Sequence, residues 1–224
     1  MKKSILILFV LTAVVVAAIL LRPSDGERKT QAVSGLPWQI EILPDGNSKV
    51  FGLTLTSSTI GDARERFGTD MEVAVIAAPG EPGSLEAYYN QVTAGVLTGK
   101  MILAAAVDKE TVERMRQHAV KSEYMESSTR RYALSPDDLA LAYSAPIGGI
   151  TFIPSANFGE EIALRNFGQP GERIRASEQV EHFLYPEKGL SITLDSKGKE
   201  LLQYVAPRQF ARLRDPLLVR GATK

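Results

Sequence analysis

Two histidines, His118 and His182, are the side chains best suited to acid–base chemistry near neutral pH. His182 follows Glu181 within "QVEHFLYP", a pattern typical of a strand. Because neighbours on a strand point to opposite faces, Glu181 and His182 do not form a catalytic pair by themselves. His182 also lacks companion metal ligands nearby in the sequence. His118 lies in the last turn of a predicted helix, where the helix dipole favours a cation. We therefore interpret both histidines as structural.

Patterns for nucleophilic or phosphate chemistry are also missing from the sequence. No serine lies in a G-x-S-x-G turn, and the glycine-rich "PGEPGS" lacks the Lys-Ser/Thr of a phosphate loop. The acidic pairs Asp137–Asp138 and Glu160–Glu161 fall in the first turns of predicted helices, where carboxylates stabilise the helix. The basic run at 129–131 could hold an anion, although a solvated strand edge also explains it. We predict a protein that is not an enzyme and that uses no cofactor and no metal.

Tyrosine and arginine are enriched at the hot spots of protein–protein interfaces. We therefore predict a binding surface that includes Tyr185, Tyr204, Arg208 and Arg212. The segment "RQFARLRDPLL" (208–218) is predicted to form a short basic helix. Its apolar stripe either packs on the sheet or docks a protein partner or an anionic lipid surface.

Charge and cysteine content exclude several classes of protein. The 224 residues include 26 Lys+Arg and 26 Asp+Glu, so the chain lacks the basic footprint of a nucleic-acid-binding protein. The chain contains no cysteine, which excludes disulfides, thiolate zinc sites and cysteine nucleophiles. A lipid-modified N-terminal cysteine is excluded for the same reason.

Residues 4–21 form an uncharged, apolar run that starts after Lys3 and ends before Arg22. As a helix this run would span about 27 Å, close to the ~30 Å hydrocarbon core of a bilayer. We predict a signal anchor over residues 1–22, with a cleaved signal peptide or a buried helix as alternatives. A polar linker over 23–35 follows. With the short N-terminal tail inside, the protein is expected to cross the inner membrane once and to place its C-terminal domain in the periplasm.

After the linker, helical and alternating hydrophobic periods predict an α+β domain. The predicted helices cover 57–67, 109–120, 135–145 and 155–167, followed by the C-terminal segment. The predicted strands cover 36–43, 50–55, 71–78, 85–92, 100–107, 123–134, 147–154, 171–177, 179–186, 189–195 and 200–207. The first two strands are expected to form a hairpin around "PDGNSK". The expected N-caps are Ser57 or Ser58, Asp108, Ser135, and Ser155 or Asn157.

A short internal repeat links the two halves of the domain. "ARERFG" (63–68) and "ALRNFG" (163–168) share Ala, Phe and Gly and lie one hundred residues apart. Each ends a predicted helix and precedes a run of strands, and each glycine is a natural helix stop. This order predicts a divergent tandem repeat of two α+β units, 36–145 and 146–224. Each unit would pack short helices on an antiparallel meander in two layers.

The second half also resembles a known family. A helix ending in "FGQP" (167–170), the strand "EHFLYP" and the segment "GLSITLDSKGKELLQYV" are similar to the SmpA/OmlA-type small lipoproteins of β-barrel assembly. They are also similar to tandem β-lactamase-inhibitor-like modules, and the resemblance covers residues 155–205. It implies an α+β module that works by protein–protein contact. This chain lacks the family's lipidated cysteine and has a predicted membrane anchor instead.

We therefore predict a membrane-anchored periplasmic protein that acts as a non-catalytic interaction or envelope-assembly module. Its expected partners are the inner membrane, through residues 4–21, and an envelope protein. The alternative is a periplasmic hydrolase or small-ligand sensor that uses a cleft between the two units. An enzyme needs titratable groups gathered in one pocket, whereas an interaction module needs an exposed apolar or Tyr/Arg patch.

Overall fold

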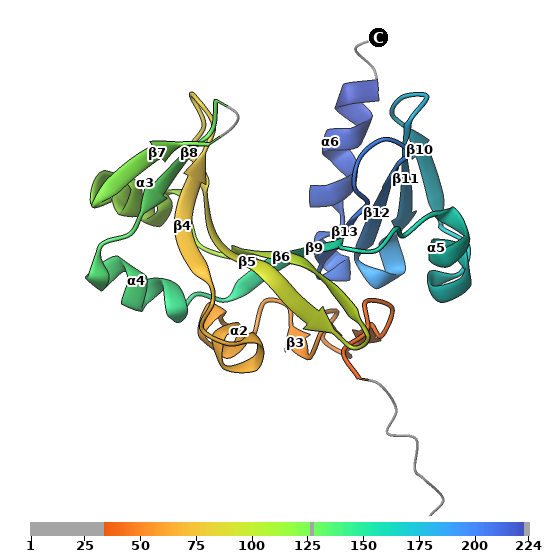
Figure 1. The fold of residues 1–224 in the computed structure, drawn as a ribbon, viewed down its shortest axis with the longest axis horizontal. Helices are drawn as coiled ribbons and strands as arrows, with labels where there is room; N and C mark the ends of the chain where they lie inside the picture. The colour runs from red at the N-terminus through yellow and green to blue at the C-terminus, as the bar shows by residue number, and fades with distance from the viewer. Residues whose placement is uncertain (1–33, 126–127, 222–224) are drawn as a thin grey trace, which may run out of the picture. The chain divides into compact units, whose positions relative to one another are not determined.

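The computed structural model describes residues 34–125 and 128–221, which adopt an α+β fold (Figure 1). The predicted α+β class is therefore confirmed. The five α-helices of the described residues are α2 Ile60–Phe67, α3 Lys109–Gln117, α4 Pro136–Tyr143, α5 Glu160–Phe167 and α6 Ala211–Gly221. Two short 3₁₀ turns, η1 Pro186–Lys188 and η2 Pro207–Gln209, complete the helical elements.

Within these residues no helix has the length and apolar character needed to cross a membrane. The predicted anchor at 4–21 and most of the predicted linker at 23–35 lie outside the described residues.

Ten antiparallel strands form one continuous sheet in the order β10-β11-β12-β13-β9-β6-β5-β4-β8-β7 (Figure 1). Their bounds are β4 Glu72–Ala77, β5 Ser84–Ala94, β6 Leu97–Ala105, β7 Lys121–Tyr124, β8 Arg130–Ala133, β9 Ile147–Pro154, β10 Glu172–Arg175, β11 Val180–Tyr185, β12 Leu190–Asp195 and β13 Leu201–Val205. In the middle of the sheet, Ile150 of β9 lies opposite Leu103 of β6 and Tyr204 of β13. The sheet therefore continues across the unit boundary that was predicted after residue 145.

The N-terminal hairpin differs from the prediction. A separate small sheet contains β1 Glu41–Ile42, β2 Ser48–Val50 and β3 Leu53–Thr54. The predicted strand 50–55 is interrupted by a second tight turn at Phe51 and Gly52, whose φ angles are 55° and 79°. Two positive φ angles in a two-residue loop define a type I′ turn. Sequence periodicity missed this turn because phenylalanine is seldom found in the left-handed region.

The predicted strand 123–134 is also wrong, because the chain folds there into the β7–β8 hairpin. Glu123 of β7 pairs with Arg131 of β8, and the amide of Met125 donates to the carbonyl of Thr129 at 2.9 Å. The polar residues between the two strands carry no glycine or proline. The usual turn signal was therefore absent.

Two of the four predicted helix N-caps are confirmed. Asp108 and Ser135 accept hydrogen bonds from the backbone amides of Thr111 and Asp138, as expected. The N-cap of α2 is Thr59, which forms a reciprocal capping box with Asp62, so the predicted Ser57 or Ser58 cap is wrong. Helix α5 starts after Gly159 with no side-chain cap, so the predicted Ser155 or Asn157 cap is wrong.

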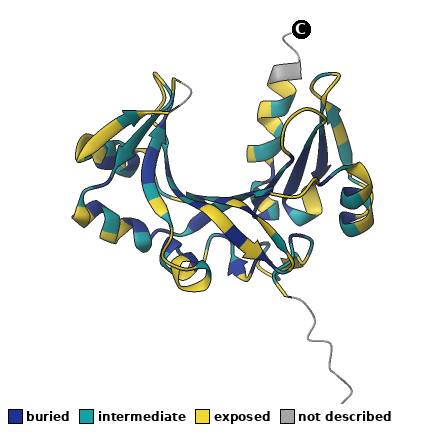
Figure 2. Cartoon of the chain, in the orientation of Figure 1, coloured by how far each residue is buried: buried dark blue, intermediate teal, exposed yellow. Residues whose placement is uncertain are grey.

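Both faces of the ten-stranded sheet carry packed elements, but unequally. On one face, the small sheet, α2 and α5 enclose the main core, while α3 and α4 cover Val75 and Leu85. On the opposite face α6 packs on Leu184 and Val205 through Phe210. Figure 1 shows α6 over the β10–β13 end, and Figure 2 shows the buried residues following the strands. None of these hydrophobic clusters includes Ala74, Ile76, Tyr88 or Ile102, which lie on one face of β4, β5 and β6. We call this part of the sheet the open face.

Candidate functional site

Tyr185 was predicted to form part of a binding surface, but the structure buries it completely. Its hydroxyl donates to the carbonyl of Gly168 at 3.0 Å, and its ring centroid lies 5.9 Å from that of Phe167. Tyr89 makes the equivalent bond to Gly68 at 3.3 Å. Burial raises the pKa of both phenols to about 12. Each tyrosine therefore fastens the end of a Phe-Gly helix to the sheet, and the prediction for Tyr185 is wrong.

Tyr204 was also predicted at the surface and is also buried. Its hydroxyl donates to the carbonyl of Pro37 at 3.1 Å, and its ring lies 5.3 Å from that of Phe51. Burial raises the pKa of this phenol well above its usual value. Tyr204 thus links the main sheet to the start of the domain, and its predicted surface role is wrong. Local sequence patterns could not predict this burial, because Pro37 and Phe51, which contact Tyr204, are far from it in the sequence.

The two predicted arginines are exposed, but the structure does not bring them together with the two tyrosines on one surface. Arg208 donates to the carbonyl of Asp45 and to the hydroxyl of Thr56, both at 3.2 Å, and Arg212 donates to Gln209 at 3.1 Å. The apolar side of α6 packs on the sheet, which bears out the packing interpretation of this segment. A binding role of Arg208 and Arg212 stays a prediction.

We expect Tyr185→Phe to lower the free energy of unfolding by about 1 kcal/mol, the usual net value of one hydrogen bond. The ring remains packed, so only the bond to Gly168 is lost. Tyr89→Phe should have a smaller effect because its bond to Gly68 is longer. Urea unfolding followed by the fluorescence of Trp38, the single tryptophan, measures both changes. Equal stability of both variants and the wild type would contradict this role.

Neither histidine lies in a catalytic arrangement. His182 is buried on β11, and its Nδ1 lies 3.0 Å from the hydroxyl of Thr193, its direct neighbour on β12. His118 is exposed, and its Nδ1 lies 3.6 Å from a carboxylate oxygen of Asp138. Among residues 34–125 and 128–221, no three potential metal ligands of the His, Cys, Asp or Glu type come together.

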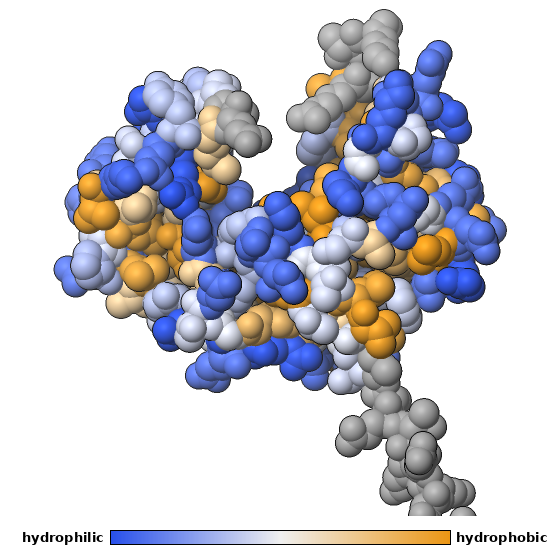
Figure 3. All heavy atoms as spheres, in the orientation of Figure 1, coloured by the Kyte–Doolittle hydropathy of each residue, from blue (hydrophilic) through white to orange (hydrophobic). Residues whose placement is uncertain are grey.

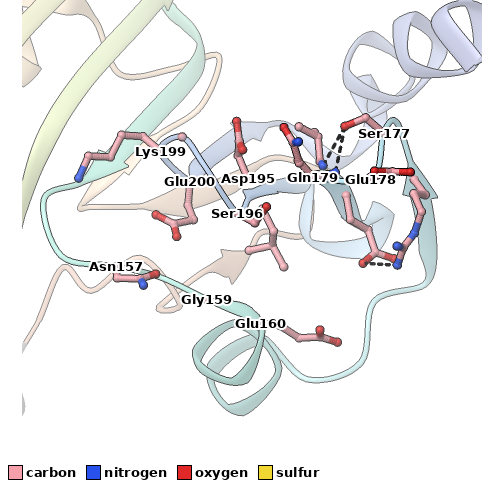
Figure 4. Close-up of a pocket in the computed structure, with 15 residues that line it drawn as sticks. Asn157, Gly159, Glu160, Ser177, Glu178, Gln179, Asp195, Ser196, Lys199 and Glu200 are labelled. Carbon is pink, nitrogen blue, oxygen red and sulfur yellow. Dashed lines mark hydrogen bonds and ion pairs between the residues drawn. The ribbon is translucent and has the colours of Figure 1, made fainter.

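A polar cavity of about 540 Å³ lies near the start of α5 and the β10–β11 turn (Figure 4). Two cationic side chains line it, those of Arg175 and Lys199. Its acidic lining residues are Glu160, Glu178, Glu181, Asp195 and Glu200. Arg175 pairs with Glu181 at 3.5 Å, and Ser177 accepts from two backbone amides of its own turn. Figure 4 shows the side chains of Glu160, Asp195 and Glu200 pointing in different directions. The cavity therefore contains several charged side chains, but its carboxylates do not converge on one point where a substrate atom could react.

A second cavity, of about 530 Å³, lies on the open face. Its apolar lining consists of Ala74, Ile76, Tyr88, Ile102 and Met125, and its polar lining consists of Glu72, Glu86, Glu123, Tyr124 and Arg131. At its rim, Tyr124 is 71% exposed and Met125 is 47% exposed. Figure 3 shows the surface hollowed between the β7–β8 hairpin and α6, with both hydrophobic and hydrophilic residues at its border. We call the cavity of about 530 Å³ the open-face cavity.

The charges of the open-face cavity fall into two groups. Arg131 binds both Glu123, at 2.6 Å, and Glu72. Hydrogen bonds from Lys121 and Arg131 lower the pKa of Glu123 to about 2. Glu86 is half-buried, and burial raises its pKa although the Ser84 hydroxyl donates to it at 2.6 Å. Burial therefore disfavours the charged form of Glu86, whereas the hydrogen bonds to Glu123 favour its charged form.

Sequence reasoning missed the open-face cavity, although one signal was available. The runs "MEVAVIAA" and "KMILAAAV" are apolar on both faces of their strands, which is typical of strands covered on both sides. Among the described residues, one of these sides lies outside the hydrophobic clusters and lines the open-face cavity. An apolar strand face that the described residues leave open is a candidate for contact with another molecule.

The chain matches no protein-family model, no curated protein and no solved structure. The resemblance of residues 155–205 to small envelope lipoproteins therefore stays a prediction. The functional proposal below therefore rests on the contacts, charges and cavities of the described residues.

Proposed function

We propose that this protein is a non-catalytic binding module that holds a protein partner against the open face. The observation that carries the proposal is the open-face cavity, which combines an apolar floor with the exposed rim residues Tyr124 and Met125. Tyrosine is enriched at binding hot spots, and methionine adapts its shape to a partner.

The same proposal includes the cellular setting and the repeat. Residues 1–22 would anchor the chain in the inner membrane as a single-pass segment, and 23–35 would link it to a periplasmic domain that binds an envelope protein. The two units 36–145 and 146–224 would be divergent repeats. This relation is supported by the buried alanines Ala63 and Ala163 at matching helix positions, and by the matching tyrosine–glycine hydrogen bonds.

The alternative, a hydrolase or ligand sensor with its site between the two units, has less support. The cavity that joins β6, β9, β13 and α6 has a volume of only about 150 Å³. Its lining includes Thr151, Gln203 and Arg212 but no histidine or carboxylate. A general acid–base pair needs such groups within hydrogen-bond reach of a substrate.

The proposal predicts that a membrane partner is captured through the cavity rim. Full-length tagged protein is crosslinked in membranes, and the captured proteins are identified by mass spectrometry. We expect the double variant Tyr124→Ser/Met125→Ser to capture at least about tenfold less of the partner than the wild type does, since one hot-spot side chain contributes 2 kcal/mol or more.

A matched control is Val96→Ser, which removes another exposed apolar side chain, 70% exposed, from the β5–β6 turn. This variant should capture the partner as the wild type does. Equal capture by the double variant, or loss in Val96→Ser as well, would count against binding at the open face.

A further inference from the structure

We infer that the open-face cavity receives a lysine or arginine side chain of the partner, with Glu86 as its counter-charge. This inference rests on the binding function proposed above and names the chemistry that the partner must present. It follows from the strand register, the unequal pairing of charges and the shape of the apolar walls.

The register places Glu86 in the middle of the open face between two small residues. Glu86 lies opposite Ala74 on β4 and opposite Ala104 on β6. On one side of this row, Ile76 pairs with Ser84; on the other side, Tyr88 lies between Glu72 and Ile102. Because alanine side chains are short, the larger residues of the adjacent rows stand higher than the floor around Glu86. A side chain that enters from solvent can therefore reach the carboxylate.

The charges of the cavity favour a cation. Its lining contains three carboxylates, those of Glu72, Glu86 and Glu123, and one guanidinium, that of Arg131. Arg131 is bound to Glu72 and Glu123. In residues 34–125 and 128–221 no lysine or arginine forms an ion pair with Glu86. Ser84 donates to one of its oxygens, which leaves the second oxygen to accept from a ligand.

The apolar walls select among cations. Lysine and arginine carry a methylene stem that packs on apolar surface while the charged end seeks a polar partner. Ala74, Ile76 and Ile102 supply that surface beside Glu86. A small inorganic cation would leave these walls in contact with water. The combination therefore fits a basic side chain on an otherwise apolar segment of the partner.

The test uses three fluorescein-labelled nonapeptides that differ only at a central residue flanked by leucines: lysine, norleucine or glutamate. Binding to the full-length protein in detergent is followed by fluorescence polarisation. We expect the lysine peptide to bind about tenfold more tightly than the norleucine peptide, because a charge-assisted hydrogen bond is worth at least that factor. The glutamate peptide should bind most weakly.

Two variants locate the effect. Glu86→Gln keeps the shape of the side chain and should remove the preference for lysine, whereas Glu81→Gln, at an exposed turn position, should retain it. Ala74→Leu fills the floor and should weaken the lysine and norleucine peptides alike. Similar affinity for lysine and norleucine peptides, an unchanged preference in Glu86→Gln, or no binding of any peptide at millimolar concentration would overturn the inference.

The outcome is separable from that of the function proposed above. If partner capture depends on Tyr124 and Met125 but is unchanged in Glu86→Gln, the open face binds a partner without using a buried cation. If the rim variant also captures the partner normally, the proposed function itself fails.

Discussion

Truncation of Phe51 to alanine is expected to lower the free energy of unfolding by about 3–5 kcal/mol, the usual effect of removing a buried phenylalanine ring. Phe51 is almost completely buried between the small sheet and the main sheet. Its ring centroid lies 5.4 Å from that of Phe152 and 5.3 Å from that of Tyr204. The truncation would therefore leave a cavity where the two sheets meet.

The backbone of Phe51 makes this prediction more specific. Its φ of 55° places it in the left-handed region, which disfavours residues with a Cβ atom by roughly 1–2 kcal/mol. Phe51→Ala keeps that strain, whereas Phe51→Gly removes it. We therefore expect the glycine variant to be the more stable of the two by about 1 kcal/mol, although it removes more atoms.

Urea unfolding of the two variants, followed by Trp38 fluorescence, measures both differences. Trp38 packs against the same core and reports on the same junction. A glycine variant less stable than the alanine variant would show that the turn does not hold Phe51 under strain. A loss below about 1 kcal/mol in both would show that the ring is not part of the stabilising core.

Gly189→Ala is expected to destabilise the protein by about 2–5 kcal/mol, through backbone strain and a steric clash together. Gly189 has φ 63° and ψ 30°, the left-handed conformation. A Cβ atom there would lie 2.0 Å from the carbonyl oxygen of Val205 and 3.0 Å from the nitrogen of Pro207. The carbonyl of Gly189 also accepts a hydrogen bond of 2.9 Å from the Val205 amide, so the two segments cannot separate without losing it.

Gly46→Ala is the matched control for this change. Gly46 also has a positive φ, 78°, but a Cβ atom there would meet nothing within 4 Å. The control should therefore lose only the backbone contribution, roughly 1–2 kcal/mol. Thermal or urea unfolding of both variants separates the two contributions, and an equal loss would mean that the close approach at Val205 is easily relieved.

The elements of this fold were predictable wherever the signal was local. Asp108 and Ser135 cap their helices as predicted because an N-cap side chain needs only the amide three residues later. Gly68 and Gly168 end α2 and α5 for a similarly local reason, since both have positive φ. The strand runs were recognised by their hydrophobic alternation, and so the α+β class was recognised as well.

The candidate site was not predictable in the same way. Tyr185 and Tyr204 have the residue type of a hot spot, but their burial depends on partners 17 and 167 residues away in the sequence. The open-face cavity combines residues of β4, β5 and β6 with residues of the β7–β8 hairpin, which sequence periodicity had merged into one strand. Composition gave no indication of which apolar strand face remains uncovered.

By itself, the sequence determined the absence of cysteine chemistry, the balance of charge, the α+β class, the N-caps of α3 and α4 and the glycine stops of α2 and α5. Each of these depends on composition or on contacts within a few residues. Only the tertiary structure decided the strand order, the burial of the two tyrosines and the position of Glu86 between two alanines. These features depend on pairing between strands far apart in the chain, and that pairing is chosen by the total burial and hydrogen bonding of the whole sheet.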